Sequence, residues 1–134
     1  MRSNKKLNLL IERPKTARDV LRNAYNVIKD KKAWTQGVAF KAERDRAINA
    51  DGYHAKNVAM QPGCQMCATG AIMYGAGFNN KLATSARSVL RKVIFKITKN
   101  SDLGIVGFND RLGTKHADVK KAFLRAIFNA PAAK

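Results

Sequence analysis

Acidic residues are scarce in this sequence. It has 9 Asp and Glu against 26 Lys and Arg in 134 residues, so its formal net charge is +17 at pH 7. A surface with this charge repels itself, and such an excess usually serves binding to a polyanion such as nucleic acid. Solubility alone is a poor explanation, because acidic residues serve it better than basic ones. The shortage of carboxylates also argues against a metal-dependent nuclease, which clusters several of them around its cations.

Cysteines and long apolar runs are scarce as well. Cys64 and Cys67 lie too close in sequence to cross-link a domain, which suits a reducing cytosol. No stretch approaches the roughly 20 apolar residues of a membrane span. The apolar residues between Leu7 and Ile11 are too few for a signal peptide, whose apolar core has about 7–15 residues. We therefore expect a cytoplasmic protein with no membrane partner.

Aromatic residues make up only 7% of the chain, and most Phe residues fall at spacings typical of a core. Stacking of single-stranded bases on exposed rings is therefore not expected. The sequence also has no zinc-finger, RNP or KH motif and no convincing helix-turn-helix, so nothing in it supports sequence-specific readout.

The apolar content is sufficient for one core. The hydrophobic fraction is 46%, and 134 residues is the size of a single domain. We expect a basic N-terminal arm over residues 1–15 and a single helical domain over residues 16–130. The charge is spread through the domain, because residues 1–80 carry 14 basic and 6 acidic side chains and residues 81–134 carry 12 and 3.

Apolar residues recur at helical spacing in several segments. They predict four helices, over about 17–31, 67–75, 81–99 and from the expected cap Thr114 onward. The core face of the 81–99 helix is expected to contain Leu82, Ala86, Val89, Leu90, Val93, Ile94 and Ile97. Within residues 101–113, Asp102-Leu103-Gly104 is rich in turn-forming residues, and the run 105–110 that follows is assigned to no element. The fold class is therefore mainly α, a compact bundle of about four helices, and residues 38–58 are compatible with a small β-hairpin or an insertion.

Four short blocks, in order along the chain, resemble a known family. The blocks are Ala33-Trp34-Thr35-Gln36-Gly37, Cys67-Ala68-Thr69-Gly70-Ala71, Phe108-Asn109-Asp110, and Thr114 before Asp118-Val119. Together they resemble a family of small bacterial and phage proteins known as a domain of unknown function, with the pattern GW-x-Q-G, C-A-x-G-A, W-N-D and T-x-x-D/E-V. The likeness covers about residues 17–129. The resemblance implies a helical fold and a bacterial or phage origin, and it brings no assigned activity.

Cations gather on one side of three expected helices, whereas solvated helices normally alternate charges of both signs. Like charges one turn apart destabilise a free helix, and a bound phosphate backbone would remove that repulsion. We therefore predict a nucleic-acid-binding surface made of Arg18, Arg22, Lys29, Arg87, Arg91, Lys92, Lys96, Lys99, Lys120, Lys121 and Arg125.

A second set of residues is expected to gather around the 67–75 helix, namely Trp34, Gln36, Cys67, Asn109 and Asp110. One interpretation is a ligand pocket. The other, which we favour, is that Asn109 and Asp110 bond to loop amides and helix ends while Trp34 fills the core. We expect no catalytic residue.

The two cysteines have the spacing of half a zinc site. His54 and His116 could complete four ligands with Cys64 and Cys67. The histidines lack paired spacing, however, and no βαβ pattern surrounds the cysteines as it would a redox dithiol. We expect neither metal nor cofactor, and zinc is the alternative.

These observations predict a small, non-enzymatic phage or mobile-element protein that binds nucleic acid mainly through phosphates, with duplex or structured RNA favoured. Two alternatives use the same charges. One is a phage effector that binds an acidic surface of a host protein complex, and the other is a virion component associated with the genome. The oligomeric state is not predicted.

Overall fold

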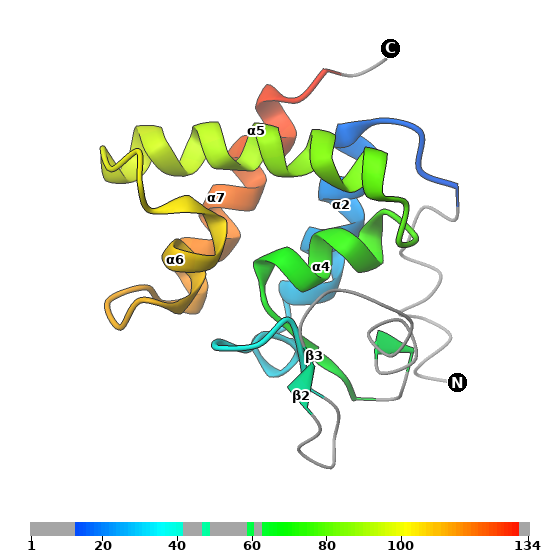
Figure 1. Cartoon of the computed structure of the whole chain (residues 1–134), viewed down its shortest axis with the longest axis horizontal. Coiled ribbons are helices and arrows are strands. Elements are labelled where there is room, and N and C mark those ends of the chain that lie inside the picture. Colours follow the sequence, from blue (N-terminus) through cyan, green and yellow to red (C-terminus); the bar gives the residue numbers. More distant parts are fainter. Residues whose placement is uncertain (1–12, 42–46, 49–58, 61–62, 132–134) are drawn as a thin grey trace.

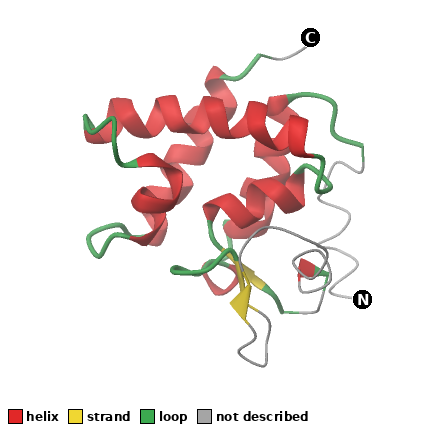
Figure 2. Cartoon of the chain, viewed as in Figure 1, coloured by secondary structure: helices red, strands yellow, loops and turns green. Residues whose placement is uncertain are grey.

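The structure is a computed structural model that describes residues 13–41, 47–48, 59–60 and 63–131. Helices dominate this part of the chain, and a small sheet lies at one end of them (Figures 1 and 2). The expected mainly α fold is therefore confirmed. The elements are α2 (Ala17–Ile28), the 3-10 helix η1 (Lys31–Ala33), β1 (Phe40–Lys41), β2 (Ala47–Ile48), β3 (Gln65–Met66), α4 (Ala68–Gly75), α5 (Asn80–Thr98), α6 (Gly104–Asp110) and α7 (His116–Asn129).

Helix α2 begins as its sequence predicts. The Thr16 hydroxyl accepts a hydrogen bond from the Asp19 backbone N–H at 3.1 Å, which satisfies one of the free amides of the first turn. The helix ends at Ile28, about a turn earlier than expected. The reason is that Asp30 starts η1 instead, by accepting a hydrogen bond from the Lys32 backbone N–H at 3.0 Å.

Helix α4 packs closely against α2 because the α4 residue at the contact is Gly75, which has no side chain. A Cβ on Gly75 would lie 2.8 Å from the Val20 carbonyl oxygen and 3.0 Å from the Ala24 backbone nitrogen. Near the other end of α4, a Cβ on Gly70 would collide with the carbonyl oxygen of Ala39. The small residues of this segment therefore set how closely α4 approaches its neighbours.

The sheet is antiparallel, with the strand order β2-β1-β3. Phe40 pairs with Ile48 on one side and with Met66 on the other. The hairpin expected near residues 38–58 is thus present as β1 and β2, although residues 42–46 and 49–58 lie outside the described ranges. The sequence does not predict β3, because a strand of two residues is too short to show a periodicity.

Helix α5 is the longest of the described helices and closely matches its expected bounds. Asn79 caps it by accepting a hydrogen bond from the Leu82 backbone N–H at 3.0 Å, and Lys99 ends it in the left-handed conformation at φ 60°. Its expected core face packs inward except at Ile97, which is 40% exposed. The chain turns away at Lys99, so the last turn of α5 lies at the edge of the core.

Residues 104–110 form helix α6, which is not among the helices predicted from the sequence. Ile105 and Phe108 are buried about a turn apart and supply its packing face. Gly104 and Gly107 lower the intrinsic helix propensity of the segment, so packing rather than local preference stabilises this short helix. The described residues therefore contain five α-helices with full bounds instead of about four.

Helix α7 begins at His116, and its N-cap is Lys115 rather than the expected Thr114. The Thr114 hydroxyl instead accepts a hydrogen bond from Nε of Arg111 at 2.8 Å. The N-terminus of α7 is capped by a residue of its own first turn: the Asp118 carboxylate accepts a hydrogen bond from the Lys115 backbone N–H at 2.8 Å.

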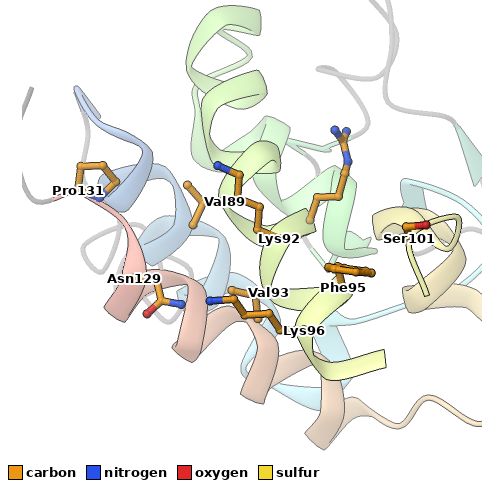
Figure 3. A pocket seen from close by; sticks show the side chains of 9 residues that line it. Val89, Lys92, Val93, Phe95, Lys96, Ser101, Asn129 and Pro131 are labelled. Carbon is orange, nitrogen blue, oxygen red and sulfur yellow. The ribbon is translucent and has the colours of Figure 1, made fainter. Parts of the chain in front are cut away.

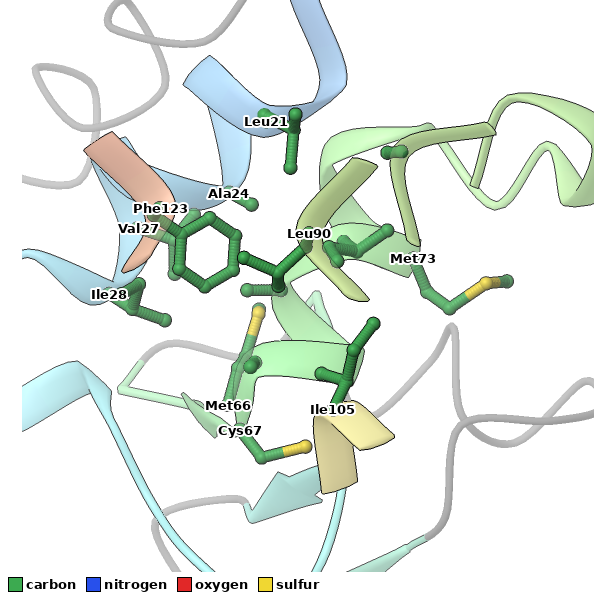
Figure 4. Close-up of a cluster of buried hydrophobic side chains, with 14 of the residues drawn as sticks. Leu21, Ala24, Val27, Ile28, Met66, Cys67, Met73, Leu90, Ile105 and Phe123 are labelled. Carbon is green, nitrogen blue, oxygen red and sulfur yellow. The ribbon is translucent and has the colours of Figure 1, made fainter. Parts of the chain in front are cut away.

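The core lies where α2, α4, α5 and α7 meet (Figure 4). Leu21 and Ile28 of α2, Leu90 of α5 and Phe123 of α7 are almost completely buried there. Burying side chains of this size contributes about 1.5–3 kcal/mol each. No helix among the described residues is both long and apolar enough to cross a membrane.

Candidate nucleic-acid interface

The predicted pocket residues do come together, where η1, α4 and α6 meet. Trp34 Nε1 donates a hydrogen bond to Asn109 Oδ1 at 2.8 Å, and the Ala68 backbone N–H at the start of α4 donates to the same oxygen at 3.0 Å. Nδ2 of Asn109 donates to the carbonyl oxygen of Thr35 at 3.1 Å and to Oδ1 of Asp110 at 2.8 Å. Asn109 is 0% exposed, and its whole hydrogen-bonding capacity is used inside the protein.

We call Trp34, Gln36, Asn109 and Asp110 the Asn109 cluster. Gln36 Nε2 donates to the backbone carbonyl oxygen of Asn109 at 2.7 Å, and the Gly37 backbone N–H donates to Asp110 Oδ1 at 2.9 Å. These bonds hold the chain after η1 against α6. The polar atoms of the cluster satisfy one another, which agrees with the interpretation as a structural network of loop amides and helix ends.

Cys67 borders the Asn109 cluster with a buried thiol. It is the N-cap of α4, and its Sγ accepts a hydrogen bond from the Gly70 backbone N–H at 3.4 Å. Burial raises the pKa of the Cys67 thiol above its ordinary value, and the nearby Asp110 carboxylate acts in the same direction, against the hydrogen bond from Gly70. Because the thiolate is the reactive form, this raised pKa keeps the side chain inert.

Cys64, Cys67 and His116, the described residues of the zinc alternative, do not form a group that could hold a metal ion. Cys64 and Cys67 are both buried and free of disulfide bonds. His116 Nε2 lies 2.6 Å from the carbonyl oxygen of Ile28, and its ring centroid lies 5.5 Å from that of Trp34. Over the described ranges, no group of three or more His, Cys, Asp or Glu side chains could hold a metal ion, and His54 lies outside those ranges.

Helix α5 presents a face of one charge sign. The helix contains no acidic residue, and Arg91, Lys92 and Lys96 are exposed in its second half, followed by the exposed Lys99 at its C-cap. Of the five described carboxylates, those of Asp19, Asp30, Asp110 and Asp118 accept hydrogen bonds from backbone amides, and the exposed Asp102 lies in the turn after α5. The positive charge of α5 is therefore not cancelled along the helix.

Two of the predicted cations form hydrogen bonds within the protein. The Arg18 guanidinium donates to the carbonyl oxygens of Ile127 and Ala130 at 3.1 Å and 2.9 Å, which are among the carbonyls that a helix C-terminus leaves without partners. Arg87 is half-buried and donates to the Thr84 hydroxyl at 3.0 Å. Both side chains therefore have structural partners already.

The remaining predicted cations lie on α2 and α7. Arg22, Lys121 and Arg125 are exposed, as is Lys29 just after α2, while Lys120 is partly buried. In Figure 1, α5 lies across both of these helices. The predicted surface is thus divided over several elements, and α5 carries its most continuous part.

An open groove of about 830 Å³ runs along the exposed side of α5 (Figure 3). Its lining combines apolar and cationic side chains of this helix with polar groups from two other segments. The residues that line it are Val89, Arg91, Lys92, Val93, Phe95, Lys96, Ser101, Asn129 and Pro131.

The sequence analysis missed two side chains in particular. Asn23 is buried in α2, and its Nδ2 donates to the carbonyl oxygen of Gly75 at 2.9 Å, which ties α2 to the end of α4. Its position next to Ala24 on the apolar face was the available signal. Phe95 is 48% exposed, and its place beside the expected apolar stripe rather than in it was a signal too.

Comparison with known families matches residues 12–129 to DUF6197, a family of unknown function. The chain belongs to this family. The matched range of DUF6197 includes α2 to α7 and with them the Asn109 cluster and every residue that lines the α5 groove except Pro131. The expectation of a family without assigned activity is confirmed. No curated protein and no solved structure matches the chain.

Proposed function

We propose that this DUF6197 protein is a small, non-enzymatic protein that binds nucleic acid mainly through phosphate groups and with little sequence specificity. The observation that carries the proposal is the exposed cationic stretch of Arg91, Lys92, Lys96 and Lys99 on a helix without acidic residues. Contacts from Lys and Arg to phosphates supply most of the free energy of non-specific binding. Duplex or structured RNA is the favoured ligand, because both present closely spaced phosphates.

The energetics of the free helix support the proposal. Lys92 and Lys96 are one turn apart, and a like-charge pair at this spacing destabilises a helix by about 0.2–0.5 kcal/mol. The Lys and Arg residues of α5 repel one another in the same way when nothing is bound. A phosphate placed between such side chains changes the sign of the interaction, so the arrangement is favourable in a complex.

The other parts of the proposal have separate support. A non-enzymatic role agrees with the Asn109 cluster, whose polar atoms bond to one another, and with the burial of the Cys67 thiol. A phage or mobile-element origin and a bacterial cytoplasmic location rest on the sequence blocks and on the small number of cysteines in the chain.

Charge reversal on α5 tests the proposal. The variant R91E/K92E/K96E changes side chains that are exposed, so its circular dichroism spectrum should match that of the wild type. Because three phosphate contacts are lost, its affinity for a labelled 20-base-pair duplex in about 0.1 M salt should fall by at least about 100-fold. Fluorescence anisotropy measures this change.

A matched control separates the α5 surface from net charge alone. The variant K31E/K32E/K115E reverses three exposed cations of η1 and the α7 N-cap, so both variants lower the formal net charge by the same amount. Its affinity should stay within about threefold of the wild type. An equal loss in both variants, or no loss in a folded α5 variant, would contradict the assignment of this surface.

A further inference from the structure

We propose that the α5 groove binds unpaired nucleotides, with the ring of Phe95 stacking on a base while Arg91, Lys92 and Lys96 bind the neighbouring phosphates. The inference rests on the proposed function but changes the ligand favoured at this site from a duplex to unpaired nucleotides, and it departs from the expectation that exposed rings do not stack on bases. Single-stranded DNA or RNA, or an unpaired segment of a structured RNA, would be bound more tightly at this site than a uniform duplex.

Phe95 lies outside the core and among cations. Its side chain is 48% exposed, and it stands four residues after Arg91, a spacing that places the two side chains on one side of the helix. Figure 3 shows its ring beside α5, toward Ser101. Among the described residues, the rings in contact are Trp34 with His116 and Phe40 with Phe78, so no described ring stacks on Phe95.

The apolar part of the groove is the feature that phosphate binding alone does not explain. A duplex presents phosphates and sugars to a protein surface and keeps its bases stacked inside, so Lys and Arg would suffice to bind it. Val89, Val93 and Phe95 also line the groove. An unpaired nucleotide offers both a phosphate for the cations and the face of a base for the ring.

The size of the groove fits this ligand. Its volume of about 830 Å³ falls in the range of sites that hold small organic molecules, about 300–1,000 Å³. Ser101 on one side and Asn129 on the other supply polar groups that can contact base edges or sugars (Figure 3). Most Phe residues were expected in the core, and Phe95, which is not part of the expected apolar stripe, is one of the exceptions.

The test compares a labelled 12-nucleotide oligo(dT) with a 12-base-pair duplex. Phe95→Leu keeps an apolar side chain and good helix propensity but removes the aromatic face. Since stacking on one ring contributes a factor of about 5 to about 100 in affinity, oligo(dT) binding should fall by this factor while duplex binding changes less than about twofold. Phe95→Trp should restore oligo(dT) binding, and unlabelled oligo(dT) should quench the fluorescence of its new indole.

Phe128→Leu is the matched control, because Phe128 is 83% exposed on α7 but does not line the groove. It should leave both affinities unchanged. The inference is wrong if the Phe95→Leu variant binds oligo(dT) as tightly as the wild type does. It is also wrong if oligo(dT) does not quench the indole fluorescence of the Phe95→Trp variant. In both cases the proposed phosphate binding is unaffected. If the wild type binds neither the oligonucleotide nor the duplex, the proposed function fails as well.

Discussion

At the scale of single residues, Asn109 links three separate parts of the chain. Its side chain accepts hydrogen bonds from Trp34 and from the start of α4, and it donates to Thr35 after η1 and to its neighbour Asp110. A buried amide with every donor and acceptor paired specifies one arrangement of its neighbours, since each alternative leaves a polar group unsatisfied.

Asn109→Ala should therefore be strongly destabilising. It leaves the Trp34 indole N–H and the Ala68 backbone N–H without their acceptor in a buried site, and it creates a small cavity. We expect the free energy of unfolding to fall by about 2–4 kcal/mol. Urea denaturation measures the change.

Leu112→Ala is the control for that measurement, because Leu112 is fully exposed. It should change the free energy of unfolding by less than about 0.5 kcal/mol. A loss below about 1 kcal/mol for Asn109→Ala would show that the network does not hold these segments together.

Some residues of the candidate site could be predicted from the sequence better than others. Trp34, Gln36, Asn109 and Asp110 could be grouped because they flank helices that must pack together. The partner of each atom could not be predicted, since it depends on where α6 lies, and α6 has weak local signals. For Arg18, the sequence shows a cation on a helix surface, but not the end of α7 that it contacts.

At the scale of elements, the contact between α2 and α4 is set by backbone rather than by side chains. Gly75 allows the last turn of α4 to approach the backbone of α2, and Asn23 then reaches the Gly75 carbonyl oxygen. The helices that follow in the sequence, α5 and α7, complete the core over this contact.

Gly75→Ala should separate these two helices. The added Cβ would lie 2.8 Å from the Val20 carbonyl oxygen, which is backbone and cannot move aside cheaply. We expect a loss of about 1–3 kcal/mol in the free energy of unfolding, although alanine favours helix. Thermal denaturation followed by circular dichroism would show it as a lower Tm.

Gly113→Ala provides the comparison, because a Cβ there meets nothing within 4 Å. It should be neutral or stabilising by up to about 1 kcal/mol. Equal Tm values for the two variants would mean that α4 tolerates a wider separation from α2 than the structure indicates.

Predictability also differs between the elements. Helices α2, α5 and α7 carry long apolar stripes, so their existence and inward faces follow from periodicity. Helix α6 and strand β3 do not, because seven and two residues give too little pattern and contacts with distant residues stabilise them. Helix α2 ends early because Asp30 caps η1. The apolar periodicity of α2 alone predicted that the helix would continue to about residue 31.

At the scale of the whole molecule, the described basic side chains lie outside the buried apolar core. The formal net charge of the chain is +17, which leaves a strongly positive surface for a partner. A protein that binds phosphates and one that binds an acidic protein surface share this property. They differ in how affinity depends on salt, because phosphate binding releases condensed counterions.

The most direct test of the central claim is the affinity of the wild-type protein for a labelled duplex DNA, measured by anisotropy across a salt series. If Arg91, Lys92 and Lys96 each contact a phosphate, log K should fall linearly with log salt with a slope of about −3 or steeper, at roughly −0.9 per contact. A slope near zero, or binding too weak to measure at low salt, would contradict the account and assign the positive charge to a different kind of partner.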